Sequence, residues 1–550
     1  MVGVCALTLL LAALPTSVGV TSLGSSPQTF SATGTSAGVS LLYPSHFHDF
    51  AELGQEISNF AAAAPQLVDV EVIGQSYEGR NIVCLRLTNE LNTEQKAKTL
   101  VVAHHHGREQ ITIEMALRFM LRLLNGYGVD PAITSFLDTE EVYVVPSLNP
   151  DALDRVVNGG NHWLRKNLRP FNDDGDASFD EDSPEDVNGD GWIAGYDVYL
   201  KSGASLVYQS TFYEGIDNDR DGRINEDPEG LVDINRNYGA YWGGSPGSSG
   251  NPADEIYRGS AGFSEPETKA LRDFASNHRF GMAYSIHSGT NATYFPSDLY
   301  GYWVNPTLFS PVYSDLVALL PSGFNTYQGL GEQGEPARRL LESGQCGMWE
   351  DWMYSQRNTP LPITFELYHD ASVDEPGAFT VILNNSTHVI YRWNGIYGYF
   401  NPAASHIDAL WSDVLPAFDY LLATTPRLTV QLQSVAGLGS SLSVSVNLRC
   451  LSARLGTVDL VYVRGEDGSL LHTAPVVSAG GSAVVAFSLP LAAGSQQLVR
   501  IGNDYTGYVR LVISSLSGYA LIVGAGLTVA LVVAVIIYVV RRRRRAASRS

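Results

Sequence analysis

Two histidines and one glutamate have the types and spacing of metal ligands. His106 and Glu109 stand three residues apart in the stretch 104–109 (HHHGRE), directly after an apolar run. Zinc takes imidazole and carboxylate ligands, and it needs a third one from elsewhere. His287 follows the apolar run 282–286, and strand ends in open α/β sheets border the ligand crevice. A lone His-x-x-Glu also arises by chance, so the prediction of a zinc site depends on this third ligand.

Two clusters combine arginine with amide side chains, as a site for an anion would. The first is Arg165-Lys166-Asn167, and the second is the stretch 233–237 (DINRN). Arginine stays charged at any relevant pH and binds a carboxylate through two parallel hydrogen bonds. Both clusters therefore suit the anionic end of a substrate. Glu366 is a different case, because it lies inside the apolar run 363–367, where a carboxylate needs a partner or a catalytic task such as general base.

The elements that must position these residues alternate along the chain. Strands are predicted at 67–73, 81–87, 99–103, 142–146, 282–286 and 363–366, with helices at 48–64 and 111–124. Such alternation is typical of an α/β sheet flanked by helices. After residue 426 the pattern changes to short Ser/Val/Leu alternations with Gly-rich turns, which predicts a small all-β sandwich at 426–517.

Six motifs in order resemble those of the zinc carboxypeptidase family, the carboxypeptidase A-like metallopeptidases. They are His106-x-x-Glu109, Asn149-Pro150-Asp151, Arg165-Lys166-Asn167, Asp233-x-Asn235-Arg236-Asn237, His287-Ser288 and Phe365-Glu366-Leu367. The resemblance covers roughly residues 41–422. It implies a mixed eight-stranded sheet flanked by helices, which we assign to a catalytic domain at 41–425.

The resemblance implies the catalytic roles. His106, Glu109 and His287 would bind one catalytic zinc ion, and a water would take the fourth position. Glu366 would deprotonate that zinc-bound water. Arg165 would hold the scissile carbonyl and the oxyanion that develops on it, an interaction worth roughly 2.7 to 4 kcal/mol per donor.

The resemblance also implies how substrate is held. Asn235 and Arg236 would bind the terminal carboxylate, and Arg108 would assist with the preceding peptide. His104 and His105 are expected to support the site without binding the metal. The substrates would be the C-termini of peptides or proteins.

Two positions depart from the family pattern or extend it. The family often has a tyrosine on a loop before its final glutamate, but here Leu340 stands at or near that place, and Tyr327 is the other candidate. Glu350 lies near the position where the family senses the side chain being removed. An acid there would favour Lys or Arg, and solvated surface charge is the alternative.

An acidic insert interrupts the catalytic domain at 171–229. It holds 17 acidic and 3 basic residues, a net charge of −14. Two stretches have the oxygen-ligand spacing of shortened calcium loops. Their proposed ligands are Asp186, Asn188, Asp190 and Asp197 in the first and Asp217, Asp219 and Asp221 in the second, with a weaker third site at Asp174, Asp176, Asp180 and Asp182. A solvated acidic loop without calcium is the alternative.

Both ends of the chain look like targeting segments. Residues 1–20 are apolar and predict a secretory signal, although no basic residue precedes the apolar run, so an uncleaved anchor stays open. A Ser/Gly/Thr-rich linker follows at 21–40. The stretch 518–540 is uncharged and long enough to span a bilayer, and the tail 541–550 carries six arginines. We therefore expect a single-pass cell-membrane protein with an extracellular catalytic domain and a cytoplasmic C-terminus.

Composition narrows the function further. The chain has 57 acidic and 35 basic residues among 550, which argues against general nucleic-acid binding. The predicted function is a zinc-dependent metallocarboxypeptidase. An inactive peptide-binding ectodomain and an amidase or cell-wall peptide hydrolase of the same fold remain alternatives. A calcium-dependent adhesion ectodomain would leave Arg165, Asn235, Arg236 and Glu366 without a reason. The sequence identifies no partner protein.

Overall fold

A mixed β-sheet forms the centre of the α/β part, with strand order β1-β2-β4-β3-β7-β9-β8. Its strands are β1 (Val68–Gln75), β2 (Asn81–Leu87), β3 (Lys96–Ala103), β4 (Glu140–Val145), β7 (Met282–His287), β8 (Thr293–Tyr294) and β9 (Pro362–Glu366). β4, β3, β7 and β9 are parallel, whereas β1, β2 and β8 pair antiparallel. The mixed sheet is confirmed, and the six strands predicted from the sequence are all present. The described residues give the sheet seven strands before the C-terminal strands join it, where eight were expected.

The computed structural model describes residues 38–514, apart from 173–177, 226, 228–229, 245–246, 290–292, 297–305, 321–344, 371–378, 394–395, 439–440, 453 and 491–495. The predicted signal, membrane span and basic tail lie outside the described residues, as does most of the predicted linker. Within the described part of the chain, no helix is both long and apolar enough to cross a membrane.

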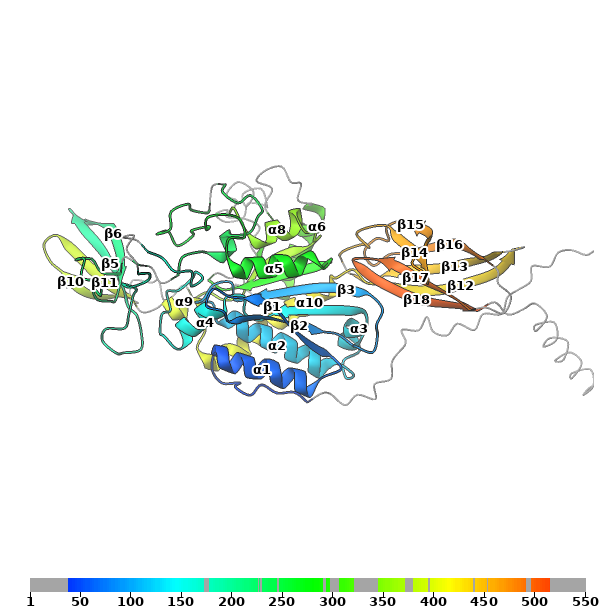
Figure 1. The fold of residues 1–550 in the computed structure, drawn as a ribbon, viewed down its shortest axis with the longest axis horizontal. Coiled ribbons are helices and arrows are strands. Elements are labelled where there is room, and N and C mark those ends of the chain that lie inside the picture. Colours follow the sequence, from blue (N-terminus) through cyan, green and yellow to red (C-terminus); the bar gives the residue numbers. More distant parts are fainter. Residues whose placement is uncertain are drawn as a thin grey trace, which may run out of the picture.

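Helices cover both faces of the central sheet (Figure 1). They are α1 (Phe50–Ala63), α2 (Ile111–Gly126), α3 (Pro131–Thr139), α4 (Pro150–Val157), α5 (Pro266–Ser276), α6 (Pro306–Leu319), α8 (Trp349–Ser355), α9 (Ile396–Phe400) and α10 (Ile407–Ala423), with 3-10 turns η1 (Ile234–Arg236) and η3 (Ala404–His406). Alternate residues of β3 point to opposite faces. Val101 belongs to a buried apolar cluster with residues of α1, α2, α3 and α10, and Leu100 belongs to another with residues of α5 and α8. Each face therefore has its own buried apolar layer.

A second, four-stranded sheet projects from one end of the molecule, at the left of Figure 1. Its order is β10-β11-β5-β6, from β5 (Gly195–Ser202), β6 (Ser205–Tyr213), β10 (Thr380–Asn384) and β11 (His388–Trp393). All three pairings are antiparallel. Two segments that are far apart in the sequence thus build one sheet, and the acidic insert supplies half of it.

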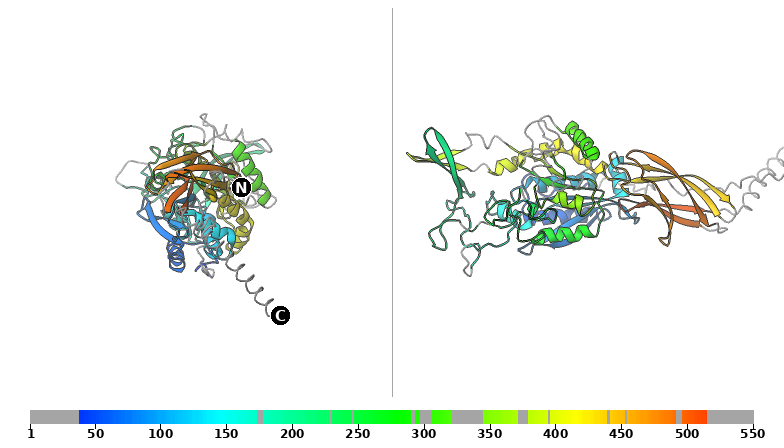
Figure 2. Two further views of the ribbon diagram at one scale, coloured as in Figure 1. Left: turned by 90° about the vertical axis from the view of Figure 1, so that its right-hand side faces the viewer. Right: turned by 90° about the horizontal axis from the view of Figure 1, so that it is seen from above.

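The strands after residue 427 lie at the opposite end of the molecule (Figures 1 and 2). They are β12 (Leu428–Leu438), β13 (Ser441–Cys450), β14 (Val461–Gly465), β15 (Leu470–Ala474), β16 (Ser482–Pro490), β17 (Gln496–Asn503) and β18 (Thr506–Ser514). β12-β13-β16 form one sheet, β18-β17-β14-β15 form another row, and a single buried apolar cluster draws residues from both. β18 also pairs with β3 through Thr506↔Ala97 and Gly507↔Lys96, so this row is continuous with the central sheet.

The strand order brings the candidate metal-binding and catalytic residues to one edge of the central sheet. β3, β7 and β9 are parallel neighbours, so their carboxyl ends meet at the same edge. His106 follows β3 by three residues, His287 ends β7, and Glu366 ends β9. His287 and Glu366 are directly paired in register. The fold therefore gathers residues that are 260 positions apart in the chain.

Candidate active site

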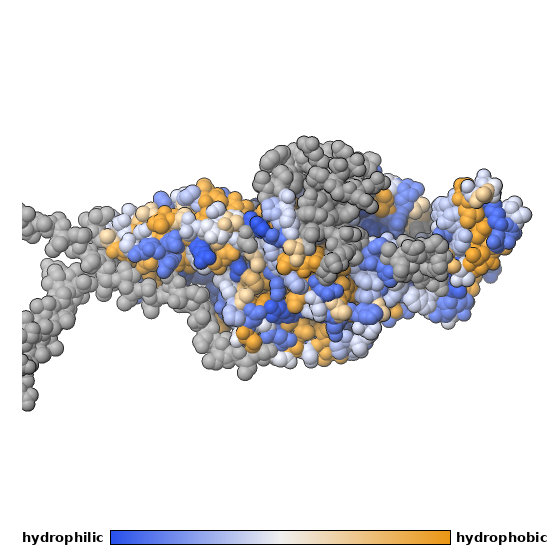
Figure 3. Space-filling view, turned by 180° about the vertical axis from the view of Figure 1, so that it is seen from behind, coloured by the Kyte–Doolittle hydropathy of each residue, from blue (hydrophilic) through white to orange (hydrophobic). Residues whose placement is uncertain are grey.

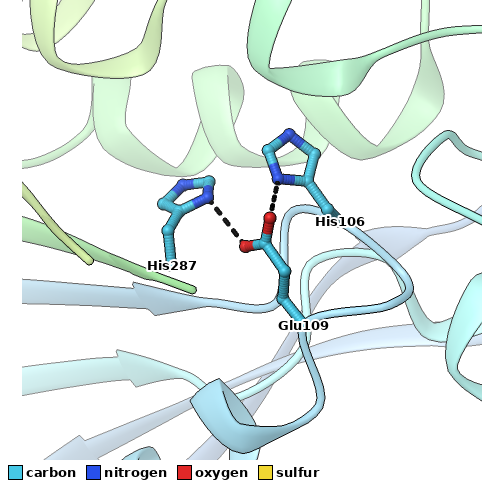
Figure 4. A group of neighbouring side chains, drawn as sticks. All are labelled: His106, Glu109 and His287. Carbon is cyan, nitrogen blue, oxygen red and sulfur yellow. Dashed lines mark hydrogen bonds and ion pairs between the residues drawn. The ribbon is translucent and has the colours of Figure 1, made fainter. Parts of the chain in front are cut away.

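Three side chains converge as a metal centre would require (Figure 4). His106 Nδ1 lies 2.7 Å from Glu109 Oε1, and His287 Nδ1 lies 3.0 Å from Glu109 Oε2. One ligand atom from each of the three lies within 4.8 Å of the others, and all three residues are buried. Burial alone would raise the pKa of Glu109, but the two histidines hold it well below its usual range. Two imidazoles and one carboxylate are the donor set of a catalytic zinc site, so these residues fit the ion that the sequence predicted.

Asp233 contacts the ring nitrogen of His106 that does not face Glu109. Its Oδ1 lies 3.2 Å from His106 Nε2, and its Oδ2 accepts hydrogen bonds from Arg165 Nε and Nη2, each at 2.9 Å. Burial would raise the pKa of Asp233, but Arg165, Arg236 and His106 keep it well below the usual range. A carboxylate behind a histidine fixes the ring and leaves the other nitrogen for a metal. The carboxylate therefore orients a metal ligand and Arg165 together.

The loop after β3 is fixed by contacts that face away from the site. His104 lies between Ser147 Oγ (2.9 Å) and the Gly107 carbonyl (3.0 Å). His105 lies between Tyr238 Oη (2.8 Å) and Ser285 Oγ (3.0 Å). Burial lowers the pKa of both rings, that of His104 to about 4, so both are neutral. They support the loop without joining the metal cluster, in the positions that the sequence analysis expected.

Two asparagines of the recognised motifs link the loops of the site. Asn149 caps α4, and its Nδ2 donates to the carbonyls of His105 (3.2 Å) and Lys166 (3.1 Å). Asn167 donates to Glu265 Oε2 (2.9 Å) and Glu267 Oε2 (3.0 Å). These two amides hold the loop of Arg165 between the histidine loop and α5.

Glu366 faces the same pocket as the three ligands. The pocket has a volume of about 250 Å³, and its lining includes His106, Glu109, Arg165, His287 and Glu366. Burial and the nearby Glu109 carboxylate raise the pKa of Glu366 to about 8. Its Oε2 is buried and has no hydrogen-bond partner among the described residues. A cation bound at the cluster would favour the ionised form of Glu366, because opposite charges lower a carboxyl pKa.

Asn235, Arg236 and Arg108 also line this pocket. Asn235 Oδ1 accepts from the Trp349 amide (3.1 Å), and Arg236 donates to the Gly247 carbonyl (2.6 Å). The guanidinium of Arg108 lies 4.3 Å from the centre of the Phe400 ring. All three predicted substrate-binding residues thus line the same cavity as the predicted metal ligands.

Glu350 lies in the wall of the same pocket and is buried. Its Oε2 accepts a hydrogen bond from Thr364 Oγ1 at 2.9 Å, and burial raises its pKa above the ordinary value. It is therefore not a solvated surface acid, which was the alternative. Leu340 and Tyr327, the candidates for the loop tyrosine, lie outside the described residues. Tyr294 and Tyr399 line the described pocket.

The acidic insert brings two of the predicted calcium ligands of the second loop together. Asp217 and Asp219 lie with the buried Asp182 in a group whose carboxylate oxygens are within 4.8 Å of one another. Asp221 is not part of this group. The calcium assignment of the second loop stays a prediction.

The first loop folds around its own backbone. Asp186 accepts from the amides of Gly189 (2.8 Å) and Gly191 (2.7 Å), and Asn188 Oδ1 accepts from the Asp190 amide (3.0 Å). Asp197 lies in β5, where it accepts from Thr211. Among the described residues, Asp186, Asp190 and Asp197 do not bring their carboxylate oxygens together as a metal site would require. Calcium at this loop also stays a prediction.

Sequence reasoning missed two functional contacts. Asp233 was recognised only as part of a motif, although it joins His106 to Arg165. Glu255 was not singled out, yet it pairs with Arg108 at 2.6 Å. The available signal for Asp233 was its place at the start of the motif that contains Arg236. Glu255 stands in a loop without a motif, and nothing in the sequence marks it.

Comparisons with known proteins identify the family of the α/β part. A family model described as zinc carboxypeptidase (Peptidase_M14) matches residues 53–417. A zinc carboxypeptidase of Saccharothrix mutabilis subsp. capreolus is 32% identical over 126 residues, 22% of this chain and 29% of the relative. Carboxypeptidase A2 of Mus musculus is 28% identical over 257 residues, 46% of this chain and 47% of the relative. Carboxypeptidase A1 of Bos taurus is 24% identical over 384 residues, covering 68% and 70%.

Solved structures show a weaker likeness. The crystal structure of thrombin activatable fibrinolysis inhibitor is 20% identical, covers 71% of this chain and 77% of that one, and gives a TM-score of 0.49. Carboxypeptidase A from Helicoverpa armigera is 17% identical, covers 72% and 76%, and gives 0.46. Of the curated relatives above, this chain spans 29% and 47% of the length of the first two.

Proposed function

Because the chain belongs to the zinc carboxypeptidase family, we propose that it is a zinc-dependent metallocarboxypeptidase that removes C-terminal amino acids from peptides. One observation carries the proposal. The converging ligand atoms of His106, Glu109 and His287 share a single pocket with Glu366 and with three arginines. A metal, a base and a carboxylate-binding site within one cavity are the parts that hydrolysis at a chain end requires.

Each group has a distinct task in the proposed reaction. Zinc held by His106, Glu109 and His287 would lower the pKa of a water molecule and polarise the scissile carbonyl. Glu366 accepts the proton of the attacking water and returns it to the leaving nitrogen. Arg165, fixed by Asp233, donates hydrogen bonds to the carbonyl oxygen as negative charge develops there.

The remaining pocket residues select a chain end. Arg236 and Asn235 bind the terminal carboxylate, since the guanidinium cannot lose its charge at physiological pH. Arg108 contacts the preceding peptide. Glu350, buried beside Thr364, favours a C-terminal Lys or Arg because a cationic side chain would pair with its carboxylate.

We also propose that the chain acts at the cell surface. Support comes from the sequence: residues 1–20 resemble a signal, 518–540 is long and apolar enough for an anchor, and 541–550 is basic. The strands of 426–517 would form a sandwich domain between this anchor and the catalytic domain. Calcium is proposed to bind the acidic insert and neutralise its net charge of −14.

The direct test measures release of C-terminal amino acids from a panel of blocked dipeptides. The purified protein would be assayed with calcium present, and wild type would be compared with Glu366→Gln. We expect release to fall by about 10² to 10⁴-fold in the variant, the range of general-base catalysis, while bound zinc stays at one per chain.

Other outcomes separate the alternatives. Zinc bound without release from any dipeptide would favour an amidase or cell-wall peptide hydrolase if an amide or a cell-wall peptide is cleaved. If nothing is cleaved but C-terminal peptides bind, the chain is an inactive peptide-binding ectodomain. A protein that binds no zinc would contradict the proposal.

A further inference from the structure

Six aromatic side chains form a continuous row on the projecting four-stranded sheet. The row runs Trp163, Trp393, Phe379, Tyr391, Tyr199 and Tyr208, with successive ring centroids 5.1, 5.7, 6.0, 5.6 and 5.6 Å apart. We call it the aromatic row. Every ring is at least partly exposed, and Tyr208 at the far end is 52% exposed. In the space-filling view, this projecting sheet also exposes residues of high hydropathy, a class that on this scale excludes tyrosine and tryptophan (Figure 3).

Strand register places these rings on one face. Tyr391 and Trp393 are two residues apart in β11, and Tyr199 of β5 lies opposite Tyr208 of β6. Side chains alternate along a strand, so these positions share a face. Gly195 opens β5 opposite Trp393, and a Cβ at Gly195 would overlap the Trp163 ring. The missing side chain lets Trp163 lie against the sheet and join the row.

Trp163, the first residue of the aromatic row, is not part of the pocket lining but contacts a lining residue through its backbone. The Trp163 carbonyl accepts a hydrogen bond from Arg108 Nη1 at 3.3 Å, and Arg108 lines the pocket. Arg165 follows Trp163 by two residues and also lines the pocket. The centroid of the Tyr213 ring lies 5.1 Å from that of Trp163. Burial and the negative charge of Glu255, the ion-pair partner of Arg108, raise the pKa of Tyr213. A chain leaving the pocket past Arg108 therefore meets the first ring of the row.

We propose that the aromatic row binds the segment of the peptide substrate that precedes the scissile bond. This inference rests on the proposed carboxypeptidase function. From Trp393 to the level of Tyr199 the sheet advances four strand residues, roughly 13 Å at ~3.3 Å per residue. An extended substrate would thus contact the row with about four residues beyond those in the pocket. Exposed rings suit apolar or aromatic residues in that segment.

The opposite face of the same sheet also exposes apolar side chains, among them Leu200, Val207 and Phe212, but it differs in its link to the pocket. There Tyr196 stacks on Phe212 with centroids 5.0 Å apart, and Arg392 pairs with Asp190 at 2.8 Å. No ring contact among the described residues joins this pair to Trp163. If the aromatic side chains only stabilised this sheet, substitutions on either face would have the same effect on the dependence on peptide length. Substrate binding requires only the face that continues the pocket.

The test varies substrate length. A blocked dipeptide is compared with peptides that keep the same C-terminal pair and add two, four, six or eight residues, either apolar and aromatic or Gly/Ser. Wild type, Tyr199→Ala, Tyr208→Ala and the opposite-face control Tyr196→Ala are assayed as the zinc-loaded full chain. Thermal unfolding of each variant shows whether the sheet remains folded.

We expect kcat/KM of wild type to rise about tenfold with apolar extension and to level off near four added residues, the number that the row can contact. In Tyr199→Ala, the ratio of long-peptide to dipeptide kcat/KM should fall about fivefold or more, as for an anchor residue of an interface. Tyr196→Ala should keep the wild-type ratio. If Tyr199→Ala fails to fold, the exposed Tyr208→Ala variant decides.

Three results would overturn the inference. One is a wild-type enzyme indifferent to peptide length, and another is equal loss in the variants of both faces. The third is a change in the molar mass of Tyr208→Ala, measured by light scattering, without a change in the dependence on peptide length. The row would then be a contact between copies of this chain. If the chain hydrolyses no dipeptide, the proposed function fails. The affinity of Glu366→Gln for short and long peptides then decides whether the aromatic row still binds the longer chain.

Discussion

Asp233 is the residue on which most of the proposed site depends, because it contacts both His106, a proposed metal ligand, and Arg165, the proposed oxyanion donor. Asp233→Asn keeps the shape but removes the charge behind His106. We expect metal affinity to fall by about 10- to 100-fold, as is typical when the partner of a metal-bound histidine is lost. Zinc retained against a graded chelator series measures this change.

Asp138→Asn is a matched control, because Asp138 is also buried and accepts hydrogen bonds from Asn89 and Tyr127. It lies at the end of α3, away from the metal ligands. Equal zinc loss in both variants would show a general loss of stability and would contradict the role of Asp233.

Glu350 is a buried acid in the wall of the pocket. Replacing it by Gln removes the negative charge in the pocket wall while keeping an acceptor for Thr364. We expect kcat/KM for dipeptides ending in Lys or Arg to fall about 10- to 100-fold, the worth of a hydrogen bond to a charged group. Dipeptides ending in Leu or Phe should change little. A preference of wild type for Leu or Phe would contradict the assignment.

Single residues were predictable where a motif carried them. The ligands and Glu366 follow from types, spacing and order along the chain, and the fold brings them together. Glu255 could not be predicted, because its contact with Arg108 depends on how a loop closes in space. Local spacing holds no information about such a contact.

Among the elements, α5 carries a buried acid that makes stability depend on pH. Burial and the neighbouring Glu265 raise the pKa of Glu267 to about 7, while its side chain accepts from Asn167 and the Tyr77 amide. Between pH 4.5 and 7 the unfolded chain releases this proton and the folded chain keeps it, so stability falls as pH rises. The loss is complete above pH 7 and amounts to at most about 3 kcal/mol.

Glu267→Gln has no proton to release, so its Tm relative to wild type should rise between pH 5 and pH 7 and level off above pH 7. Thermal unfolding at a series of pH values measures the difference. Glu71→Gln, on an exposed position of β1, controls for the loss of one carboxylate. Parallel curves for Glu267→Gln and wild type would contradict the prediction.

The elements of the central sheet were predictable because helix and strand periods are local. Their assembly was less so. Nothing in the pattern of 195–213 indicates that it pairs with 388–393, and nothing in β18 indicates that it reaches β3. These pairings join segments far apart in the sequence, where hydrophobic alternation specifies a face but not a partner.

At the scale of the whole molecule, the acidic insert lies between the Arg165 loop and η1, so its order affects the pocket. If calcium neutralises its charge, adding calcium should raise Tm on the order of 5 °C, and a chelator too weak to remove zinc should reverse this. Asp217→Asn should reduce the shift, since Asp217 lies in the group with Asp182 and Asp219. If neither activity nor Tm changes when calcium is added or removed, the prediction is contradicted.

The continuity of β3 with β18 decides how the molecule would respond to a pulling force. Tension applied beyond Ser514 would first load β17 and β18 along their eight-residue register in shear, where many hydrogen bonds must break together. The central sheet meets β18 through only two residue pairs, Thr506↔Ala97 and Gly507↔Lys96. Because fewer residue pairs join β18 to β3 than to β17, we expect a molecule pulled from that end to lose the β3–β18 pairing before β17 and β18 separate.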